Sequence, residues 1–305
     1  MTARPDSSPG TTRPLAGVHV VTLALNLPGP AAVMRLRALG ARCTKVDPPS
    51  GDPMRGYCPA AYGQLHRGVR TVAIDLKTPA GQRRLQRLLA HADVLLTSFR
   101  PSALAKLGLD AATVQARWPR LSLVRIVGAA GARAEEAGHD LTYQAEAGLV
   151  DGVALPPSLL ADMAGALLAV EAVLLVLRQR EQTGRGVVRD VALADGAAWL
   201  ALPRTWGLTA PGALLGGAHA GYRVYACADG RVAVAALEPH FARRLGEVTG
   251  LGALTPEACL QPATAAALAA WFATRSRATL DALARTHDLP WVTLAPGSEP
   301  RADRG

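Results

Sequence analysis

The feature that most constrains the fold is a regular alternation of short β-branched runs and helix-forming segments in the first half of the chain. Val18–Leu23 is a β-branched run that predicts a strand, and the turn Asn26–Pro30 follows it. Ala31–Leu39 has the composition of a helix, and Cys43–Asp47 predicts a second strand. A strand, a helix and a further strand in this order form a β-α-β unit, in which the two strands run parallel.

The alternation continues to Val127. Further strands are predicted at Val69–Asp75, Asp93–Leu96 and Leu121–Val127, and an arginine-rich amphipathic helix at Pro79–His91. We therefore expect an α/β fold with an open, mostly parallel Rossmann-like sheet, in which ligands bind beyond the carboxyl ends of the strands. Neither a G-x-G-x-x-G motif after the first strand nor a G-x-x-x-x-G-K-[ST] motif is present, so the usual phosphate-binding fingerprints are missing.

The second half of the chain has a different pattern. Tyr222–Cys227 and Arg231–Val234 flank the dipeptide Asp229-Gly230, which is a strong signal for a β-hairpin. Helices are expected from Pro239 to Thr286. This pattern predicts a second, smaller α+β domain. The expected boundaries are a disordered N-terminal tail at 1–14, a large domain at 15–208, a linker at 209–217, the small domain at 218–295 and a polar tail at 296–305.

The formal charge of +9 suits a nucleic acid, an anionic membrane surface or a polyanionic small molecule. Only three of the 33 basic residues are lysines, and the arginines are scattered with few aromatic residues between them. This distribution disfavours a nucleic-acid platform. Leu159–Leu177 is apolar enough for a membrane span, but Asp162 and Glu171 would be costly in hydrocarbon, so we expect a buried helix instead. No secretory signal precedes the fold, and a cytoplasmic protein is expected.

The four cysteines predict no special chemistry. Cys43, Cys58, Cys227 and Cys259 lie far apart, with no C-x-x-C pair and no neighbouring histidine at metal-ligand spacing. Neither a disulfide framework nor a metal site is expected.

A small set of polar residues could carry chemistry. Asp162 lies in an apolar segment, where desolvation would raise the pKa of its carboxyl group and increase its reactivity as a nucleophile or base. The alternative is that Asp162 and Ser158 only satisfy free N–H groups at the start of a helix. Glu238 begins a helix after a strand, and there too a helix-terminal charge is the alternative role. Lys77 and Arg100 follow strands and could bind phosphate oxygens, unless they are ordinary surface charges.

Taken together, several segments resemble the class III CoA-transferase family (CaiB/BaiF type), which also contains the α-methylacyl-CoA racemases. The similarity runs from about Leu15 to Leu289, and it rests on the order and spacing of its pieces. These are Leu15-Ala16-Gly17, Pro28-Gly29-Pro30, Lys45-Val46-Asp47-Pro48-Pro49 with Gly51-Asp52, Asp75-Leu76-Lys77, Ser98-Phe99-Arg100-Pro101, Gly138-His139-Asp140, Ala161-Asp162-Met163, Asp190-Val191-Ala192 and Leu237-Glu238-Pro239.

The resemblance implies an interlocked homodimer and a catalytic aspartate at Asp162. In transferases of this family that residue attacks the acyl-CoA carbonyl, giving an acyl anhydride and then an enzyme-bound CoA thioester. The substrates would be an acyl-CoA and a small carboxylic acid, with no tightly bound cofactor, no nucleic acid and no membrane. The resemblance also assigns CoA binding to Lys77, Ser98, Phe99, Arg100, Lys106, Ala137, Gly138 and Asp140.

In the racemase branch, residues at the positions of His139 and Asp162 act as two bases at the acyl α-carbon, and a glutamate at the position of Glu238 supports the histidine. All three residues are present, so the sequence permits both reactions. Family membership favours transfer, which we place first, whereas His139 and Glu238 favour racemisation. The sequence departs from the family pattern in two places, since relatives usually have a longer C-terminal segment and the loops at 128–138 and 148–157 are short. We therefore expect an altered acyl pocket, and a catalytically degraded binding protein is a further alternative.

Overall fold

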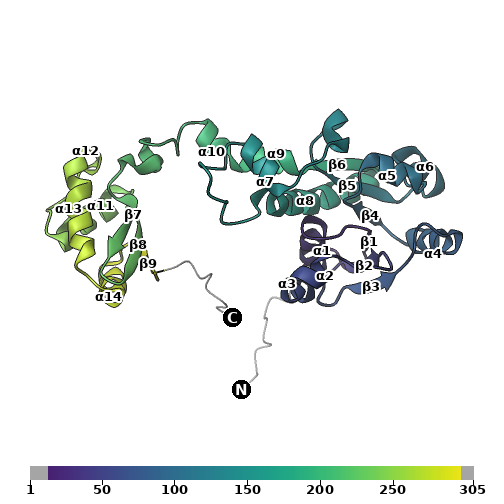
Figure 1. Ribbon diagram of the computed structural model, residues 1–305, viewed down its shortest axis with the longest axis horizontal. Coiled ribbons are helices and arrows are strands. Elements are labelled where there is room, and N and C mark those ends of the chain that lie inside the picture. The colour runs from purple at the N-terminus through teal and green to yellow at the C-terminus, as the bar shows by residue number, and fades with distance from the viewer. Residues whose placement is uncertain (1–12, 297–305) are drawn as a thin grey trace, which may run out of the picture. The chain divides into compact units, whose positions relative to one another are not determined.

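The computed structural model describes residues 13–296 of the 305-residue chain, and its elements are labelled in Figure 1. The tails predicted at 1–14 and 296–305 lie almost entirely outside the described residues. The chain divides into two compact units, residues 1–201 and 202–305, each with its own internal contacts.

The first unit is built on a six-stranded parallel sheet with the order β3-β2-β1-β4-β5-β6. This order places β1 and β4 side by side at the centre. Strands β2 and β3 follow on one side of β1 and strands β5 and β6 on the other side of β4, so the topological switch point lies between β1 and β4. The prediction of an α/β fold with a Rossmann-like parallel sheet is confirmed. The strands are β1 His19–Thr22, β2 Arg42–Asp47, β3 Arg70–Ala73, β4 Val94–Thr97, β5 Ser122–Val127 and β6 Val188–Ala192.

Helices cover both faces of this sheet because successive residues of its buried strands point to opposite sides. Val20 and Val124 belong to a core cluster with α1 and α8, whereas Val21 and Leu123 belong to a second cluster with α4, α5 and α6. The helices of the first unit are α1 Pro28–Ala38, α2 Met54–Tyr57, α3 Pro59–Leu65, α4 Pro79–Leu89, α5 Pro101–Lys106, α6 Ala111–Arg117, α7 Asp140–Glu146, α8 Leu160–Thr183 and α9 Leu193–Leu200, with the short 3-10 helix η1 at Gly131–Glu135.

The long apolar helix α8 supplies much of the core. It is long and apolar enough to cross a membrane by composition, yet 56% of its most apolar window is buried inside the protein. Ala169, Val173 and Val176 are fully buried against α1 and the sheet. Close packing at its start requires Gly165, where an added Cβ would collide with Leu193 of α9.

The second unit contains a three-stranded antiparallel sheet with the order β7-β8-β9. The hairpin predicted around Asp229-Gly230 is present, with Cys227 opposite Gly230. The expected linker 209–217 lies inside this unit. It contains turns, one of them closed by a backbone hydrogen bond from Gly212 to Gly216, and the start of the short helical segment η2. The elements are α10 Leu202–Thr205, η2 Leu214–Ala218, β7 Tyr222–Cys227, β8 Gly230–Ala235, α11 Pro239–Thr249, α12 Pro256–Cys259, α13 Pro262–Ala273, α14 Arg277–His287 and β9 Trp291–Leu294.

Candidate functional site

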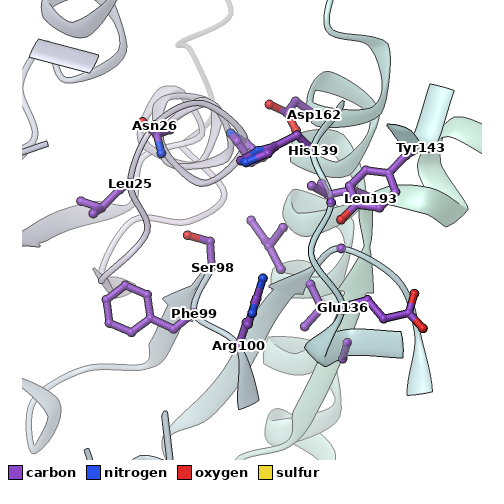
Figure 2. A pocket seen from close by; sticks show the side chains of 16 residues that line it. Leu25, Asn26, Ser98, Phe99, Arg100, Glu136, His139, Tyr143, Asp162 and Leu193 are labelled. Atoms are coloured by element: carbon purple, nitrogen blue, oxygen red, sulfur yellow. The ribbon is translucent and has the colours of Figure 1, made fainter. Parts of the chain in front are cut away.

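A cavity of about 200 Å3 opens beyond the carboxyl ends of β1, β4 and β5, where the strand order switches (Figure 2). Parallel α/β sheets bind ligands at this position because the loops on either side of the switch diverge. The loops after the three strands, the loop before α7, and the starts of α8 and α9 form its wall. The polar or aromatic side chains in the wall are Asn26, Ser98, Phe99, Arg100, Glu136, His139, Tyr143 and Asp162.

The loop after β1 is held in place by a buried group of charges. Lys45 is only 1% exposed, and its ammonium group lies 2.7 Å from a carboxylate oxygen of Asp52 and 2.5 Å from one of Asp47. Asp52 also accepts the backbone N–H of Asn26 at 3.2 Å. Asn26 has a positive φ of 61°, a left-handed conformation that asparagine adopts more readily than most other non-glycine residues, and the contact with Asp52 helps to fix this turn at the cavity wall.

The loops after β4 and β5 are tied to each other. Glu135, at the end of η1, accepts hydrogen bonds from the backbone N–H and the hydroxyl of Ser102, both at 2.7 Å. Ser102 lies in the first turn of α5, two residues after Arg100, so this contact joins the loop that carries Arg100 to the segment that precedes His139. Figure 2 shows the Arg100 side chain extending toward the interior of the cavity.

His139 precedes α7 and projects into the cavity from a tightly packed turn. Its backbone N–H donates to the hydroxyl of Thr142 at 3.1 Å, which fixes the start of the helix. The neighbouring Gly138 lies directly against the ring of Tyr143, where an added Cβ would collide with the Tyr143 hydroxyl oxygen. No larger residue fits at position 138 without displacing Tyr143, so the packing fixes the backbone from which the exposed His139 side chain projects.

Asp162 is positioned by its neighbour Asp140. The backbone N–H of Asp162, in the first turn of α8, donates to the carboxylate of Asp140 at 2.9 Å. Gln144 donates its side-chain amide to the same carboxylate and to the carbonyl oxygen of Ser158. A free N–H at the helix start is thus satisfied from α7, and α8 has no side-chain cap of its own. The alternative in which Ser158 and Asp162 cap this helix with their own side chains is wrong.

The carboxylate of Asp162 is left free, and within residues 13–296 it accepts no hydrogen bond. Burial, reinforced by the negative charge of Asp140, raises the pKa of Asp162 from 3.8 to about 6, although the nearby His139 partly offsets the rise. Figure 2 shows the two side chains beside each other at the cavity. An acid with a pKa near 6 changes its protonation state close to neutral pH, as a general base or a poised nucleophile does.

The predicted CoA-binding residues fall into three groups. Ser98, Phe99, Arg100 and Gly138 line the cavity of Asp162. Lys77 lines a second cavity of about 420 Å3 beyond the ends of β2 and β3, and Phe99 belongs to the walls of both. Lys106 and Ala137 line neither cavity, and both are exposed.

Asp140 has a different place from the one expected. It is 5% exposed, and its carboxylate is directed at the start of α8, so it acts on Asp162 and is not available to contact CoA.

Glu238 belongs to the second unit, where it is the exposed N-cap residue of α11. Its supporting role toward His139 therefore stays a prediction.

Three contributors to the site were missed by the sequence reasoning. Asn26 was assigned only to a turn, and Tyr143 and Gln144 were not assigned a role. The only available signal was their place near the predicted strand ends, because their contacts depend on packing. Among residues 13–296, no group of three His, Cys, Asp or Glu side chains is arranged to hold a metal ion.

Comparisons with known proteins identify the family. The family model described as CoA-transferase family III matches residues 15–303. The chain is 34% identical to human alpha-methylacyl-CoA racemase over 261 residues, which is 80% of this chain and 66% of the human protein. It is 32% identical to succinate–glutarate CoA-transferase of Agrobacterium fabrum over 286 residues, which is 84% of this chain and 70% of that protein. The chain therefore spans about two thirds of the length of these curated relatives.

Solved structures give the same picture. A CaiB/BaiF family protein from Brucella suis superposes with a TM-score of 0.79 at 27% identity, covering 94% of this chain and 84% of the other. The structure of a hypothetical protein from Mycobacterium tuberculosis gives a TM-score of 0.76, also at 27% identity, covering 91% of this chain and 83% of the other.

Proposed function

The chain belongs to CoA-transferase family III, and we propose that it binds acyl-CoA thioesters and exchanges the proton on the acyl α-carbon, with His139 and Asp162 as the two bases. One observation carries this proposal. An imidazole and a carboxylate whose pKa is raised to about 6 line the same small cavity. A transferase mechanism uses the carboxylate alone and has no step for the imidazole, so this pair moves proton exchange ahead of transfer.

The proposed step needs only the two side chains. The Asp162 carboxylate removes the α-proton, and the electron pair of the C–H bond moves onto the thioester carbonyl oxygen to give an enolate. Protonated His139 then returns a proton to the opposite face of the carbon, which inverts its configuration. Because the α-methylacyl-CoA racemases are among the most similar curated relatives, a 2-methylacyl-CoA is the substrate class we propose.

The two cavities suggest how CoA is held. The thioester would enter the cavity of Asp162, while the nucleotide end would occupy the cavity beyond β2 and β3, where the exposed ammonium of Lys77 can pair with phosphate. Phe99 lies in the walls of both, which supports a single ligand extending across them. In this proposal CoA is a substrate, and no tightly bound cofactor is involved.

CoA transfer is the second candidate, and a specific observation favours it too. The carboxylate of Asp162 accepts no hydrogen bond within the described residues, so both of its oxygens are free to attack a carbonyl carbon. Several relatives of similar identity are named as CoA-transferases. Attack on the acyl-CoA would expel CoA thiolate and form a mixed anhydride at Asp162, and the thiolate would then attack the aspartyl carbonyl, releasing the donor carboxylate and leaving a CoA thioester on Asp162. The acceptor carboxylate would attack this thioester and expel CoA thiolate again, and attack of the thiolate on the acceptor carbonyl of the second anhydride would form the new acyl-CoA and restore the Asp162 carboxylate.

We also propose a homodimer, and we expect the protein in the cytoplasm. The support for the dimer is an exposed apolar face on α8, where Met163, Leu167 and Leu174 recur at helical spacing and are 41%, 52% and 41% exposed. Large apolar side chains gathered on one exposed face mark interaction surfaces in soluble proteins.

Proton exchange is tested by incubating a 2-methylacyl-CoA with the protein in deuterated water and following α-deuterium by mass spectrometry. We expect incorporation by the wild type and a loss of about 100-fold or more in His139→Ala and in Asp162→Asn. Glu247→Gln is the control, because Glu247 is an exposed carboxylate that lies outside the candidate site and should leave the rate unchanged.

The same samples separate the alternatives. If no deuterium enters, but hydroxylamine traps an acyl group on Asp162 after addition of acyl-CoA, transfer replaces proton exchange as the function. If neither reaction occurs and CoA raises the melting temperature, the chain is a binding protein that has lost its chemistry. No stabilisation by millimolar CoA would contradict all three.

A further inference from the structure

A strongly basic basin lies at the amino-terminal ends of the strands of the parallel sheet, whereas the candidate site lies beyond their carboxyl ends. It has a volume of about 710 Å3 and lies at the amino ends of β1, β2 and β3. Five arginines and two histidines line it, and among the described residues no aspartate or glutamate does. The arginines are Arg13, Arg37, Arg42, Arg70 and Arg87.

The architecture brings the central residues of this basin together. His19, Arg42 and Arg70 are the first residues of three adjacent parallel strands. In the sheet register His19 lies beside Arg42, and Arg70 lies beside Thr44. Since alternate residues of a strand share a face, Arg42 and Thr44 point to the same side of β2.

Within residues 13–296 no ion pair involves the five arginines of the basin. Asp93 accepts the backbone N–H of His19 at 2.6 Å, and its other carboxylate oxygen is paired with Arg180 at 2.8 Å. Like charges gathered without counter-charges repel one another, so the basin carries an electrostatic cost in the absence of a bound anion.

Helix dipoles explain only part of this arrangement. Arg37 and Arg87 lie in the last turns of α1 and α4, where a positive charge is favourable without any ligand. That reasoning does not apply to Arg42 and Arg70, which begin strands. Guanidinium groups bind phosphate oxygens in a bidentate manner, and several of them around one concave surface suit a ligand with more than one phosphate.

We propose that this basin binds a small polyphosphate-bearing ligand, at a site separate from the cavity of Asp162. A single-stranded nucleic acid fits less well, because such platforms stack bases on aromatic side chains and none of the basin's residues is Phe, Tyr or Trp. The inference does not depend on the proposed function, since it uses none of the residues in the candidate site.

The test is calorimetric titration of the full chain with inorganic tripolyphosphate at low ionic strength. We expect a saturable site whose Kd rises about tenfold or more in the double variant Arg42→Gln/Arg70→Gln. Arg83→Gln/Arg178→Gln is the matched control, because it removes the same charge from two exposed arginines outside the basin and should leave the Kd within about twofold. The variant Arg42→Lys/Arg70→Lys keeps the charge and should bind with intermediate affinity.

Four outcomes overturn the proposal. The first is no binding at millimolar tripolyphosphate, and the second is an equal loss of affinity in the control pair. The third is binding that is lost in Arg100→Gln but kept in the basin variant, which would place the ligand in the candidate site. The fourth is tighter binding of a short oligonucleotide through the same two arginines. Should Arg42→Gln/Arg70→Gln not fold, the lysine pair alone decides, because unchanged affinity in it would show that guanidinium geometry is not used.

Discussion

The replacement Asp162→Asn should stabilise the protein at neutral pH, although it should abolish the proposed chemistry. Burial and the charge of Asp140 raise the pKa of Asp162 from 3.8 to about 6. One pKa unit corresponds to about 1.4 kcal/mol, so the ionised carboxylate lowers the free energy of unfolding by at most roughly 3 kcal/mol. Asparagine has nearly the same shape without the charge. For a domain of this size, the gain corresponds to a rise of about 6–12 °C in melting temperature at most.

The pH dependence of this stabilisation has a definite sign. The folded state holds the Asp162 proton more tightly than the unfolded state does, so stability falls as the pH rises from 3.8 to about 6. Above that window the wild type bears the full cost, and below it the cost disappears because the carboxyl group is protonated in both states. The advantage of Asp162→Asn should therefore be largest at about pH 7.5 and fall below about 1 kcal/mol near pH 4.

The measurement is urea unfolding of wild type and variant across this pH range, followed by circular dichroism. Glu247→Gln is again the control, since it removes an exposed carboxylate outside the candidate site and should change stability by less than about 0.5 kcal/mol at any pH. A gain for Asp162→Asn that is absent at about pH 7.5, or that is equally large near pH 4, would refute the argument that desolvation of this group perturbs it.

Three further predictions follow from other contacts. Asp140→Asn should move the acid limb of the deuterium-exchange pH profile to lower pH, because it removes a charge that raises the pKa of Asp162; a shift in the opposite direction would contradict this. Lys45→Met should cost about 3–5 kcal/mol in urea unfolding, because it leaves two buried carboxylates without their cation; a loss below about 1 kcal/mol would contradict this reasoning. Leu167→Arg should convert the proposed dimer to a monomer in light scattering, with an unchanged circular dichroism spectrum; a persistent dimer would place the interface elsewhere.

The sequence predicted the central strands well, because these are buried on both faces and have a local signature. β1 and β4 are fully buried strands with apolar, mostly β-branched or leucine centres, and both lie where the pattern placed them. The edge strand β6 was not predicted as a strand from its pattern. It contains exposed Arg189 and Asp190, and its pairing with β5 brings Arg125 to within 2.6 Å of Asp190, across 65 residues of sequence. An edge strand of this kind is stabilised by its distant partner, and no local pattern encodes that.

The candidate site shows the same limit. Strand ends and a family resemblance were enough to select Arg100, His139 and Asp162, which the structure places around one cavity. The position of Asp140 was not predictable, because its role depends on a hydrogen bond to a backbone group 22 residues away. Whether its carboxylate points outward to a ligand or inward to α8 is decided by the packing of α7 on α8, which the sequence does not specify.

That hydrogen bond also explains how a helix with an acid in its first turn can leave the acid free. A carboxylate in the first turn of a helix usually bonds to free backbone N–H groups, and such bonds lower its pKa. At the start of α8 the N–H of Asp162 is already taken by Asp140, and Gln144 holds Asp140 in place. The carboxylate of Asp162 therefore loses hydration without gaining hydrogen bonds, and it acquires a negative neighbour as well. Both effects keep its proton affinity high, so the residue that accepts the N–H at the helix start is also one that raises the pKa of Asp162, as the proposed proton exchange requires.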